Sequence, residues 1–463
     1  MRAAKARPTV PTDNPVASSS AHARIRTSSG IVVLGQLELD GTAANPVVMT
    51  SYADDSLAGD SNGDGDTTRA TAGDWDGIMI WGSPVNQWGF GGGSDTPLEL
   101  DHLVVKYAQG VSVHARDVSF DDSQILHSSG SGLTSDSANV DFKNGTISDS
   151  LGCGVFGWGG QLSVSGSQIK DSGGAGLSYY GLSSEQDDLA SSVSFSGNQI
   201  DNSGEEAIFV FDRGGSTNEL GDLRFNPAEF QNNQGSGNER QFIRLAGLVL
   251  DGVATWDFGE LSLPVVIGVW WTDGFSSGIA IPSGSALDIP PGTVMKFDGY
   301  SYLDAHGGPL VARGTPSKRI VFTDIDDDTV LGDTDGDGAT PDEPGLYWFG
   351  IRGSDVDLDN VKVIGAWDGL SVSPPVSVTN SEIHGEEEAG IAVYSGNEDE
   401  SSVSQRITIA NNRFVGPGVM TGEMYGYSYD LPVAVTISGG YQSASLASIG
   451  IPPLSRTHLG VET

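Results

Sequence analysis

The sequence predicts an all-β solenoid, in which short strands stack coil upon coil. Two observations carry this prediction: a short apolar frame recurs in steps of 22 residues, and a segment of about forty residues occurs twice at an offset of 273. Repeats of about 20 to 50 residues are typical of stacked-coil proteins. The composition agrees, because 65 glycines and 21 prolines among 463 residues disfavour long helices.

The frame consists of an apolar residue, four mostly polar residues and a second apolar residue. Its second position falls at Ile125, Ile147 and Ile169, and then at Ile200, a step of 31 that fits one coil with an added loop. Equivalent residues on successive coils are expected to stack about 4.8 Å apart. The frame occurs at Phe120–Ile125, Phe142–Ile147, Val164–Ile169, Phe195–Ile200, Phe225–Phe230, Val378–Ile383 and Ile409–Phe414.

A second feature fixes the same frame. Eight residues after the second apolar position comes another apolar residue, such as Leu133 or Val155, and a glycine such as Gly132 or Gly154 stands just before it. We expect these glycines to form corners with positive φ. The Asn and Asp residues at the corners are expected to cap the turns with their side chains.

These residues resemble a known superfamily. The pattern apolar-x-x-[Asn/Gly/Ser]-x-Ile, followed by Ser-Gly-x-Gly-apolar, is similar to the right-handed parallel β-helix, or pectin-lyase-like, superfamily over roughly residues 30 to 420. The resemblance implies a right-handed parallel β-helix solenoid, and the handedness rests on the resemblance alone. It says little about function, because the fold hosts lyases, hydrolases, epimerases, adhesins and phage spikes.

The chain also contains an internal duplication. Val47–Thr50 matches Ile320–Thr323, and Trp75–Ile78 matches Trp348–Ile351, both at the offset of 273. We therefore expect one long β-helix built from two copies of one unit. The predicted segments are a flexible lead-in at 1–29, a first β-helix unit at 30–210, an irregular β connection at 211–278, a second unit at 279–420, and a C-terminal β segment or cap at 421–463.

Each copy carries an acidic loop with calcium-ligand spacing. The loops read Asp-x-Asn-x-Asp-Gly and Asp-x-Asp-x-Asp-Gly, which is the first half of an EF-hand loop without its final glutamate. Carboxylates this dense would repel one another without a cation; a solvated acidic loop is the alternative. The predicted Ca²⁺ ligands are Asp60, Asn62, Asp64 and Asp66 in the first copy and Asp333, Asp335 and Asp337 in the second.

The remaining ligands of each site must come from elsewhere. The candidates are Asp54, Asp55 and Asp74 in the first copy and Asp327, Asp328, Asp342 and Glu343 in the second. The loops also resemble a segment of secreted bacterial surface proteins with β-helix repeats, in which Gly-Asp-Trp-x-Gly-Ile follows the acidic run. The second copy has lost the Asp of this motif. Trp75 and Trp348 are duplicated with the loops, so we expect them to pack beneath them.

The charge balance narrows the possible partners. With 61 acidic and 23 basic residues the formal charge is −38, which disfavours nucleic acid and anionic lipid and suits divalent cations, high salt or a cell surface. This excess of acidic residues fits a salt-adapted protein and also a calcium-dependent extracellular protein. The single cysteine, Cys153, excludes an intrachain disulfide. No stretch is apolar over the ~18 residues of a membrane span, so membrane insertion is not expected.

One column of residues is a candidate for catalysis. Two residues after the frame isoleucine stand His127, Asp149, Asp171 and Asn202, on consecutive coils. Carboxylates about 5 Å apart suit a retaining glycosidase, but no basic or aromatic partner lines up with them. A polar ladder that satisfies the turns is the favoured interpretation. For sugar stacking, Trp88 and the pair Trp270 and Trp271 are the better candidates among the tryptophans.

Together these features favour a secreted or cell-surface structural or adhesive β-helix module stabilised by Ca²⁺, with polysaccharide or cell-surface components as partners. The alternative is a carbohydrate-active enzyme of the same fold, a polysaccharide lyase or glycoside hydrolase. In that case Asp149, Asp171 and His127 are its weak catalytic candidates. The sequence does not decide the oligomeric state.

Overall fold

In the computed structural model the regular secondary structure consists almost entirely of short parallel strands. Among the residues it describes there is no α-helix, and the one 3-10 helix is η1 (Pro227–Phe230). No described helix has the length and apolar character to cross a membrane. The described residues are 24–57, 59–60, 62–65, 67–83, 92–181, 191–212, 223–259, 261–269, 278–305, 307–336, 338, 348–385, 390–394, 407–415, 419–422 and 435–438.

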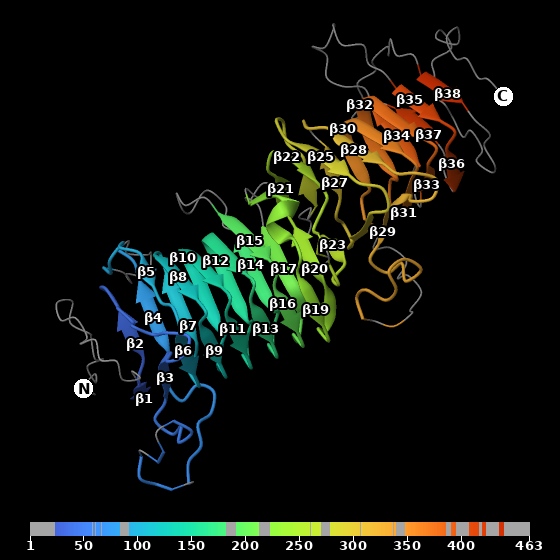
Figure 1. Cartoon of the computed structure of the whole chain (residues 1–463). Helices are drawn as coiled ribbons and strands as arrows, with labels where there is room; N and C mark the ends of the chain where they lie inside the picture. Colours follow the sequence, from blue (N-terminus) through green and yellow to red (C-terminus); the bar gives the residue numbers. More distant parts are fainter. Residues whose placement is uncertain are drawn as a thin grey trace, which may run out of the picture. The chain divides into compact units, whose positions relative to one another are not determined.

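The chain divides into two compact units. The first comprises residues 1–210, 229–243 and 258–263, and the second comprises residues 211–228, 244–257 and 264–463. Within each unit the strands lie side by side as successive coils (Figure 1). Paired structure begins at Arg24, within the segment predicted as a lead-in.

The first unit has one sheet of eight strands, which contains the predicted isoleucine column. Its strands, in spatial order, are β1 (Arg24–Thr27), β3 (Val47–Ser51), β6 (Leu103–Lys106), β9 (Gln124–Leu126), β11 (Thr146–Ser148), β13 (Gln168–Lys170), β16 (Gln199–Asp201) and β19 (Gln234–Ser236). Ile147 pairs in register with Ile125 and Ile169, and Ile169 pairs with Ile200. The 22-residue step is therefore confirmed as one coil.

The other strands of the first unit carry the opposite wall of the core. They are β2 (Ile31–Val33), β4 (Ile78–Trp81), β5 (Leu98–Glu99), β7 (Val111–His114), β8 (Asp117–Asp121), β10 (Leu133–Lys143), β12 (Val155–Ser165), β14 (Leu177–Gly181) and β15 (Ser192–Ser196). β17 (Glu206–Asp212) and β20 (Arg240–Ala246) follow, at the division of the chain. Along β10 buried and partly exposed residues alternate, as expected of a strand with one face in the core.

The glycines before Leu133 and Val155 have a different role from the one predicted. Gly154 has ordinary backbone geometry, but a Cβ there would lie 2.4 Å from Cγ2 of Ile169 and 2.6 Å from the carbonyl oxygen of Gly176. The positions are therefore kept small by the close approach of neighbouring coils. The prediction of positive φ at these glycines is wrong; positive φ occurs instead at Asp, Asn and His corners such as Asp122 and Asn144.

A buried polar ladder closes one corner of the coils. Asn198 Oδ1 accepts a hydrogen bond from the Ser167 amide at 3.0 Å, and Asn233 Oδ1 accepts one from the Asn198 amide at 3.1 Å. Asn198 also donates through Nδ2 to the Val164 carbonyl at 2.8 Å. Because each side chain satisfies the backbone of the neighbouring coil, these buried amides hold the stack in register.

The second unit repeats this construction. Its strands are β18 (Arg224–Phe225), β21 (Leu248–Leu250), β22 (Val253–Thr255), β23 (Val265–Ile267), β24 (Ile279–Ala280), β25 (Ala286–Ile289), β26 (Val294–Phe297), β27 (Leu303–Ala305), β28 (Leu310–Arg313), β29 (Ile320–Asp324), β30 (Ile351–Asp359), β31 (Val361–Ala366), β32 (Leu370–Thr379), β33 (Glu382–Gly385), β34 (Ile391–Tyr394), β35 (Ile407–Ala410), β36 (Arg413–Val415), β37 (Val419–Gly422) and β38 (Val435–Ser438). These strands pair in parallel within the described part of the chain, and β38 pairs with β35. Strands β18 and β21 to β23 lie within the segment predicted as an irregular connection.

Candidate metal centre

The two acidic loops leave the coils at equivalent places. In the first unit the loop connects β3 to β4, and in the second it connects β29 to β30 (Figure 1). The strand before each loop contains a buried threonine, Thr50 or Thr323. Each loop begins with a carboxylate bonded to that threonine, Asp54 or Asp327. The duplicated sequence has therefore folded into duplicated local structure.

Asp54 and Asp327 organise the start of each loop. Asp54 accepts hydrogen bonds from the hydroxyl of Thr50 at 2.6 Å and from the amide of Ser56 at 3.1 Å. Burial raises the pKa of Asp54, but the hydrogen bonds from Ser56 and Thr50 outweigh it and hold the pKa below its usual value. Asp327 follows the same pattern with Thr323 and Thr329. These two carboxylates are stabilised as anions by the protein itself.

The glycine-rich part of each loop curls around its first aspartate. Asp60 accepts hydrogen bonds from the amides of Gly63 at 2.6 Å and Gly65 at 2.8 Å, and both glycines have positive φ. Asp333 accepts the matching bonds from Gly336 and Gly338 at 2.7 and 3.1 Å. The amide of Gly65 is the main cause of the lowered pKa of Asp60. Glycine is required here because the left-handed backbone costs other residues energy.

Each curl gathers three carboxylates. In the first unit oxygens of Asp55, Asp60 and Asp64 all lie within 4.8 Å of one another, and in the second those of Asp328, Asp333 and Asp335 do so. The predicted ligands Asp60 and Asp64 are thus brought together, as are Asp333 and Asp335. Asn62 lies in the same curl, where its Oδ1 accepts a hydrogen bond from the Asp64 amide at 3.2 Å.

Asp55 and Asp328 complete the clusters. The sequence placed them only among several possible additional ligands, and the structure selects them over their neighbours Asp54 and Asp327. Asp74 is also placed away from the cluster, since its carboxylate bonds the Ser51 hydroxyl at 2.6 Å and the Thr71 amide at 3.0 Å. The candidates Asp66, Asp337, Asp342 and Glu343 lie outside the described residues.

Three oxygens in these clusters are buried without a hydrogen-bond partner among the described residues. They are Oδ1 of Asp55, Oδ1 of Asp64 and Oδ1 of Asp328. A buried carboxylate oxygen without a partner costs free energy, and neighbouring carboxylates add repulsion. A hard divalent cation would relieve both costs, because Ca²⁺ is bound by several carboxylate and carbonyl oxygens at about 2.3–2.6 Å. The residues present therefore fit such an ion.

The duplicated tryptophans anchor the far end of each loop. Trp75 and Trp348 are fully buried, and their indole N–H groups donate to the carbonyls of Lys106 at 2.8 Å and Ile364 at 2.9 Å. Trp348 also stacks on Phe297, with ring centroids 4.0 Å apart. We expected these tryptophans to pack beneath the loops, and the structure shows that they are buried and hydrogen-bonded to the coils. Trp88, Trp270 and Trp271 lie outside the described residues.

The column proposed for catalysis is a corner of left-handed backbone. His127, Asp149, Asp171 and Asn202 have φ values of 57°, 56°, 54° and 57°. Asn, Asp and His are among the residues that adopt this region most readily, so the turn itself explains their types. His127 Nδ1 lies 3.4 Å from Asp149 Oδ2, and Asn202 Nδ2 donates to Asp171 Oδ1 at 3.0 Å.

The expectation that no aromatic partner lines up with this column is wrong. Tyr107 follows Lys106, which pairs with Leu126 on the next coil, and its ring stacks on His127 with centroids 5.0 Å apart. Burial raises the pKa of Tyr107, and the charges of Asp54, Asp149 and Asp74 raise it further. The phenol is therefore protonated at neutral pH and poorly suited to act as a base.

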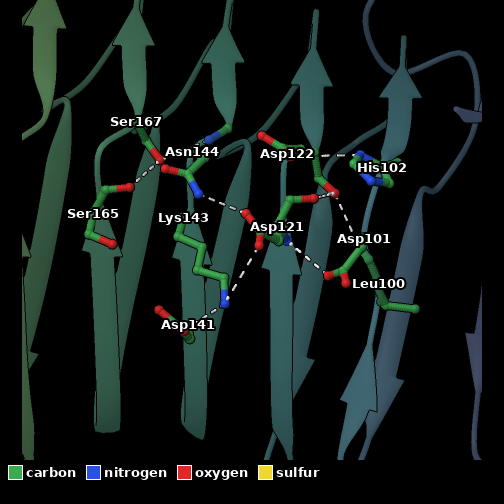
Figure 2. Close-up of polar contacts among 12 residues, drawn as sticks. Leu100, Asp101, His102, Asp121, Asp122, Asp141, Lys143, Asn144, Ser165 and Ser167 are labelled. Carbon is green, nitrogen blue, oxygen red and sulfur yellow. Dashed lines mark hydrogen bonds and ion pairs between the residues drawn. The ribbon is translucent and has the colours of Figure 1, made fainter. Parts of the chain in front are cut away.

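Figure 2 shows a second cluster of charged and polar side chains on the coils of the first unit. Lys143 Nζ lies 3.7 Å from Asp121 Oδ2 and 4.0 Å from Asp141 Oδ2. Asn144 donates to the other oxygen of Asp121 at 2.9 Å, and the Asp121 amide donates to Asp101 at 3.2 Å. The contacts of Asp121 join adjacent coils, whereas Lys143 and Asp141 share one strand, β10. On a partly exposed surface such pairs contribute modestly to stability.

An aromatic row on the outer face of the first unit was not predicted from the sequence. Register pairing places Trp81, His114, Asp136, Trp158 and Tyr180 at one position on five successive coils. Trp81 stacks on His114 at 4.0 Å between centroids, and Trp158 stacks on Tyr180 at 5.9 Å. Trp158 is 46% exposed. Burial raises the pKa of Tyr180 to about 12, so its hydroxyl remains a hydrogen-bond donor.

Comparison with known proteins identifies the fold. Residues 92–245 match the family model described as the right handed beta helix region. No curated protein and no solved structure gives a significant match to the chain. The chain is thus an all-β protein of right-handed parallel β-helix coils, as the sequence predicted. The matched region excludes both acidic loops, so it carries no information about metal binding.

Proposed function

We propose that this right-handed β-helix protein is a secreted or cell-surface structural or adhesive module whose two acidic loops each bind one Ca²⁺. The observation that carries the proposal is the pair of carboxylate clusters, in which Asp55, Asp64 and Asp328 each have a buried oxygen without a hydrogen-bond partner among the described residues. The same chemistry at equivalent places in two copies supports a shared ligand.

The position of the loops explains why calcium would stabilise the fold. Each loop lies between two strands of the coil stack, β3 and β4 or β29 and β30, and its end is anchored by Trp75 or Trp348. A cation that orders the loop therefore fixes the path between two coils. An ion that binds only the folded state adds RT ln(1 + [L]/Kd), about 2.7 kcal/mol at 100 times Kd.

The charge of the chain is consistent with this role. A formal charge of −38 disfavours the folded state through self-repulsion, and bound calcium would remove part of it. Extracellular fluids supply calcium at concentrations that suit such modules, whose Kd values are about 10⁻⁴–10⁻³ M. This supports a location outside the cell or on its surface.

Calcium titration of the intact chain tests the proposal. The wild type is expected to bind two ions, and Asp55→Asn with Asp64→Asn is expected to bind one. Asp40→Asn, at an exposed position outside both loops, is the matched control and is expected to bind two. A wild type that binds no calcium at millimolar concentration would refute the proposal.

A specific observation favours polysaccharide as the adhesive partner. The outer row Trp81, His114, Asp136, Trp158 and Tyr180 presents aromatic rings together with hydrogen-bonding groups at one position on successive coils. Aromatic faces pack on apolar faces of a ligand while their polar tips remain available, which suits sugar rings. Trp158→Ala is expected to weaken binding to an immobilised polysaccharide panel, whereas Leu151→Ala, also exposed, is not.

The alternative function is a carbohydrate-active enzyme of this fold. The column predicted as its candidate catalytic site supports this function less well. Backbone geometry explains the choice of His127, Asp149, Asp171 and Asn202, and Tyr107 is protonated at neutral pH. We therefore assign this column a structural role.

A further inference from the structure

A buried lysine lies beneath the acidic loop of the second unit. Lys296, on β26, is 0% exposed. Its ammonium donates hydrogen bonds to the carbonyls of Ile325 and Gly332, both at 3.2 Å. These two carbonyls enclose the segment that contains Asp327 and Asp328, so the lysine ties the two ends of that segment together.

The charges around Lys296 belong to the same loop. Burial lowers the pKa of Lys296 and is the larger effect. The opposing effect, which raises this pKa, comes from the carboxylates of Asp327, Asp328, Asp335 and Asp324. Two of these residues, Asp328 and Asp335, belong to the carboxylate cluster of the second unit. A fully buried ammonium requires such compensation, because an isolated buried charge is costly.

The position is basic in both copies. Lys296 pairs in register with Thr323, and in the first unit Arg26 pairs in register with Thr50. Each of these threonines donates to the carboxylate that opens its loop, Asp327 or Asp54. In both copies a basic residue is therefore the backbone neighbour, on the paired strand, of the threonine that precedes the loop.

We propose that the ammonium of Lys296 is an internal counter-ion of the second calcium site, which holds the acidic segment in place without calcium and weakens calcium binding when the ion is present. This inference rests on the calcium function proposed above. The ammonium and the ion would share Asp328 and Asp335, so each reduces the attraction of the carboxylates for the other. The second loop would then depend less on calcium for its folding.

Calcium affinity separates this role from a purely structural one. If Lys296 only bonds two carbonyls, its replacement lowers stability and leaves affinity unchanged or weaker. If it is a counter-ion, Lys296→Gln removes the charge, keeps a hydrogen-bond donor and tightens calcium binding, by about tenfold. The same variant is expected to melt at a lower temperature in chelator.

The parent for this experiment is the full chain with Asp55→Asn and Asp64→Asn, so that only the second site titrates. Lys296→Gln is expected to raise its calcium affinity, and Asp335→Asn in the same chain is expected to reduce that gain, because the two charges interact. Lys296→Arg, which keeps the charge, should bind calcium as the parent does. Lys106→Gln, in the first unit, is the matched control and should change nothing at the second site.

Each outcome is decisive. If Lys296→Gln binds calcium as tightly as the parent or more weakly, the proposal is overturned. It is also overturned if Lys296→Gln and Lys296→Arg raise calcium affinity equally. A Gln variant that folds only when calcium is added supports it, whereas one that stays unfolded in saturating calcium overturns it. A parent that binds no calcium refutes the proposed function instead, and the melting temperatures in chelator then show separately whether Lys296 holds the loop.

Discussion

Oxygens of Asp55 and Asp64 lie within 4.8 Å of each other, and each residue carries a buried Oδ1 that accepts no hydrogen bond within the described part of the chain. Such an arrangement is unfavourable by itself, because like charges repel and desolvated oxygens lack partners. It becomes favourable when a cation lies between them. In the second unit oxygens of Asp328 and Asp335 lie equally close, and Asp328 carries the buried oxygen.

Replacing Asp64 should have opposite effects with and without calcium. Asp64→Asn removes one of three clustered negative charges, so in chelator the melting temperature is expected to stay the same or rise slightly. With calcium present the variant loses a ligand and is expected to melt below the wild type. Thermal unfolding under both conditions measures this difference. If the substitution lowered the melting temperature equally in calcium and in chelator, the cause would be a general loss of packing and not the loss of a calcium ligand.

Acid should destabilise the protein through the two loop-opening aspartates. The pKa values of Asp54 and Asp327 are lowered in the folded state. Groups with lowered pKa contribute stability above the unfolded pKa of about 3.9 and lose it as the pH falls through the folded value. We therefore expect the melting temperature in chelator to fall below about pH 4, and less steeply in Asp54→Asn with Asp327→Asn. If the melting temperatures of wild type and variant fell in parallel with pH, Asp54 and Asp327 would not be the cause of the destabilisation by acid.

The corner column separates the structural function from the enzymatic one. Asp149 has φ of 56°, so Asp149→Asn should change the free energy of unfolding by less than about 0.5 kcal/mol. Asp149→Val should cost about 1–2 kcal/mol, because a β-branched residue is strained there. Chemical denaturation measures both. Polysaccharide cleavage by the wild type that disappears in Asp149→Asn or Asp171→Asn would instead make the chain an enzyme.

Gly154 should be intolerant of even one added methyl group. An alanine Cβ would lie 2.4 Å from Cγ2 of Ile169 and 2.6 Å from the Gly176 carbonyl oxygen, so a neighbouring coil would have to shift. Overpacking of this kind costs about 1–3 kcal/mol. Leu151→Ala, three residues earlier and 70% exposed, is the control and should have little effect. Denaturant unfolding of both variants tests whether coil spacing fixes the glycine.

The sequence predicted the fold correctly where the structure follows directly from the repeat period. The steps between Ile125, Ile147 and Ile169 predicted the coil, its register and the buried column, because a stack of equal coils translates spacing directly into contact. The repeat period does not reveal the physical reason for a small residue at a given position. Gly154 suggested a turn, whereas the cause is the approach of Ile169.

The sequence predicted each acidic loop and two members of its carboxylate cluster, but it did not single out the third member. Asp60 and Asp64 follow from their spacing, since alternate residues of a tight curl face one centre. Asp54 and Asp55 are chemically identical neighbours, and only the direction of the backbone decides that Asp54 bonds Thr50 while Asp55 joins the cluster. The aromatic row was missed for a related reason, because Trp81 and Trp158 align only once the coil register is known.

Calcium binding by isothermal titration calorimetry, combined with melting curves in calcium and in chelator, decides whether the two acidic loops are calcium sites. We expect two bound ions per chain, one after Asp55→Asn with Asp64→Asn, and a melting temperature that falls when chelator removes the ions. A chain that binds no calcium, with identical melting curves in calcium and in chelator, would contradict this expectation.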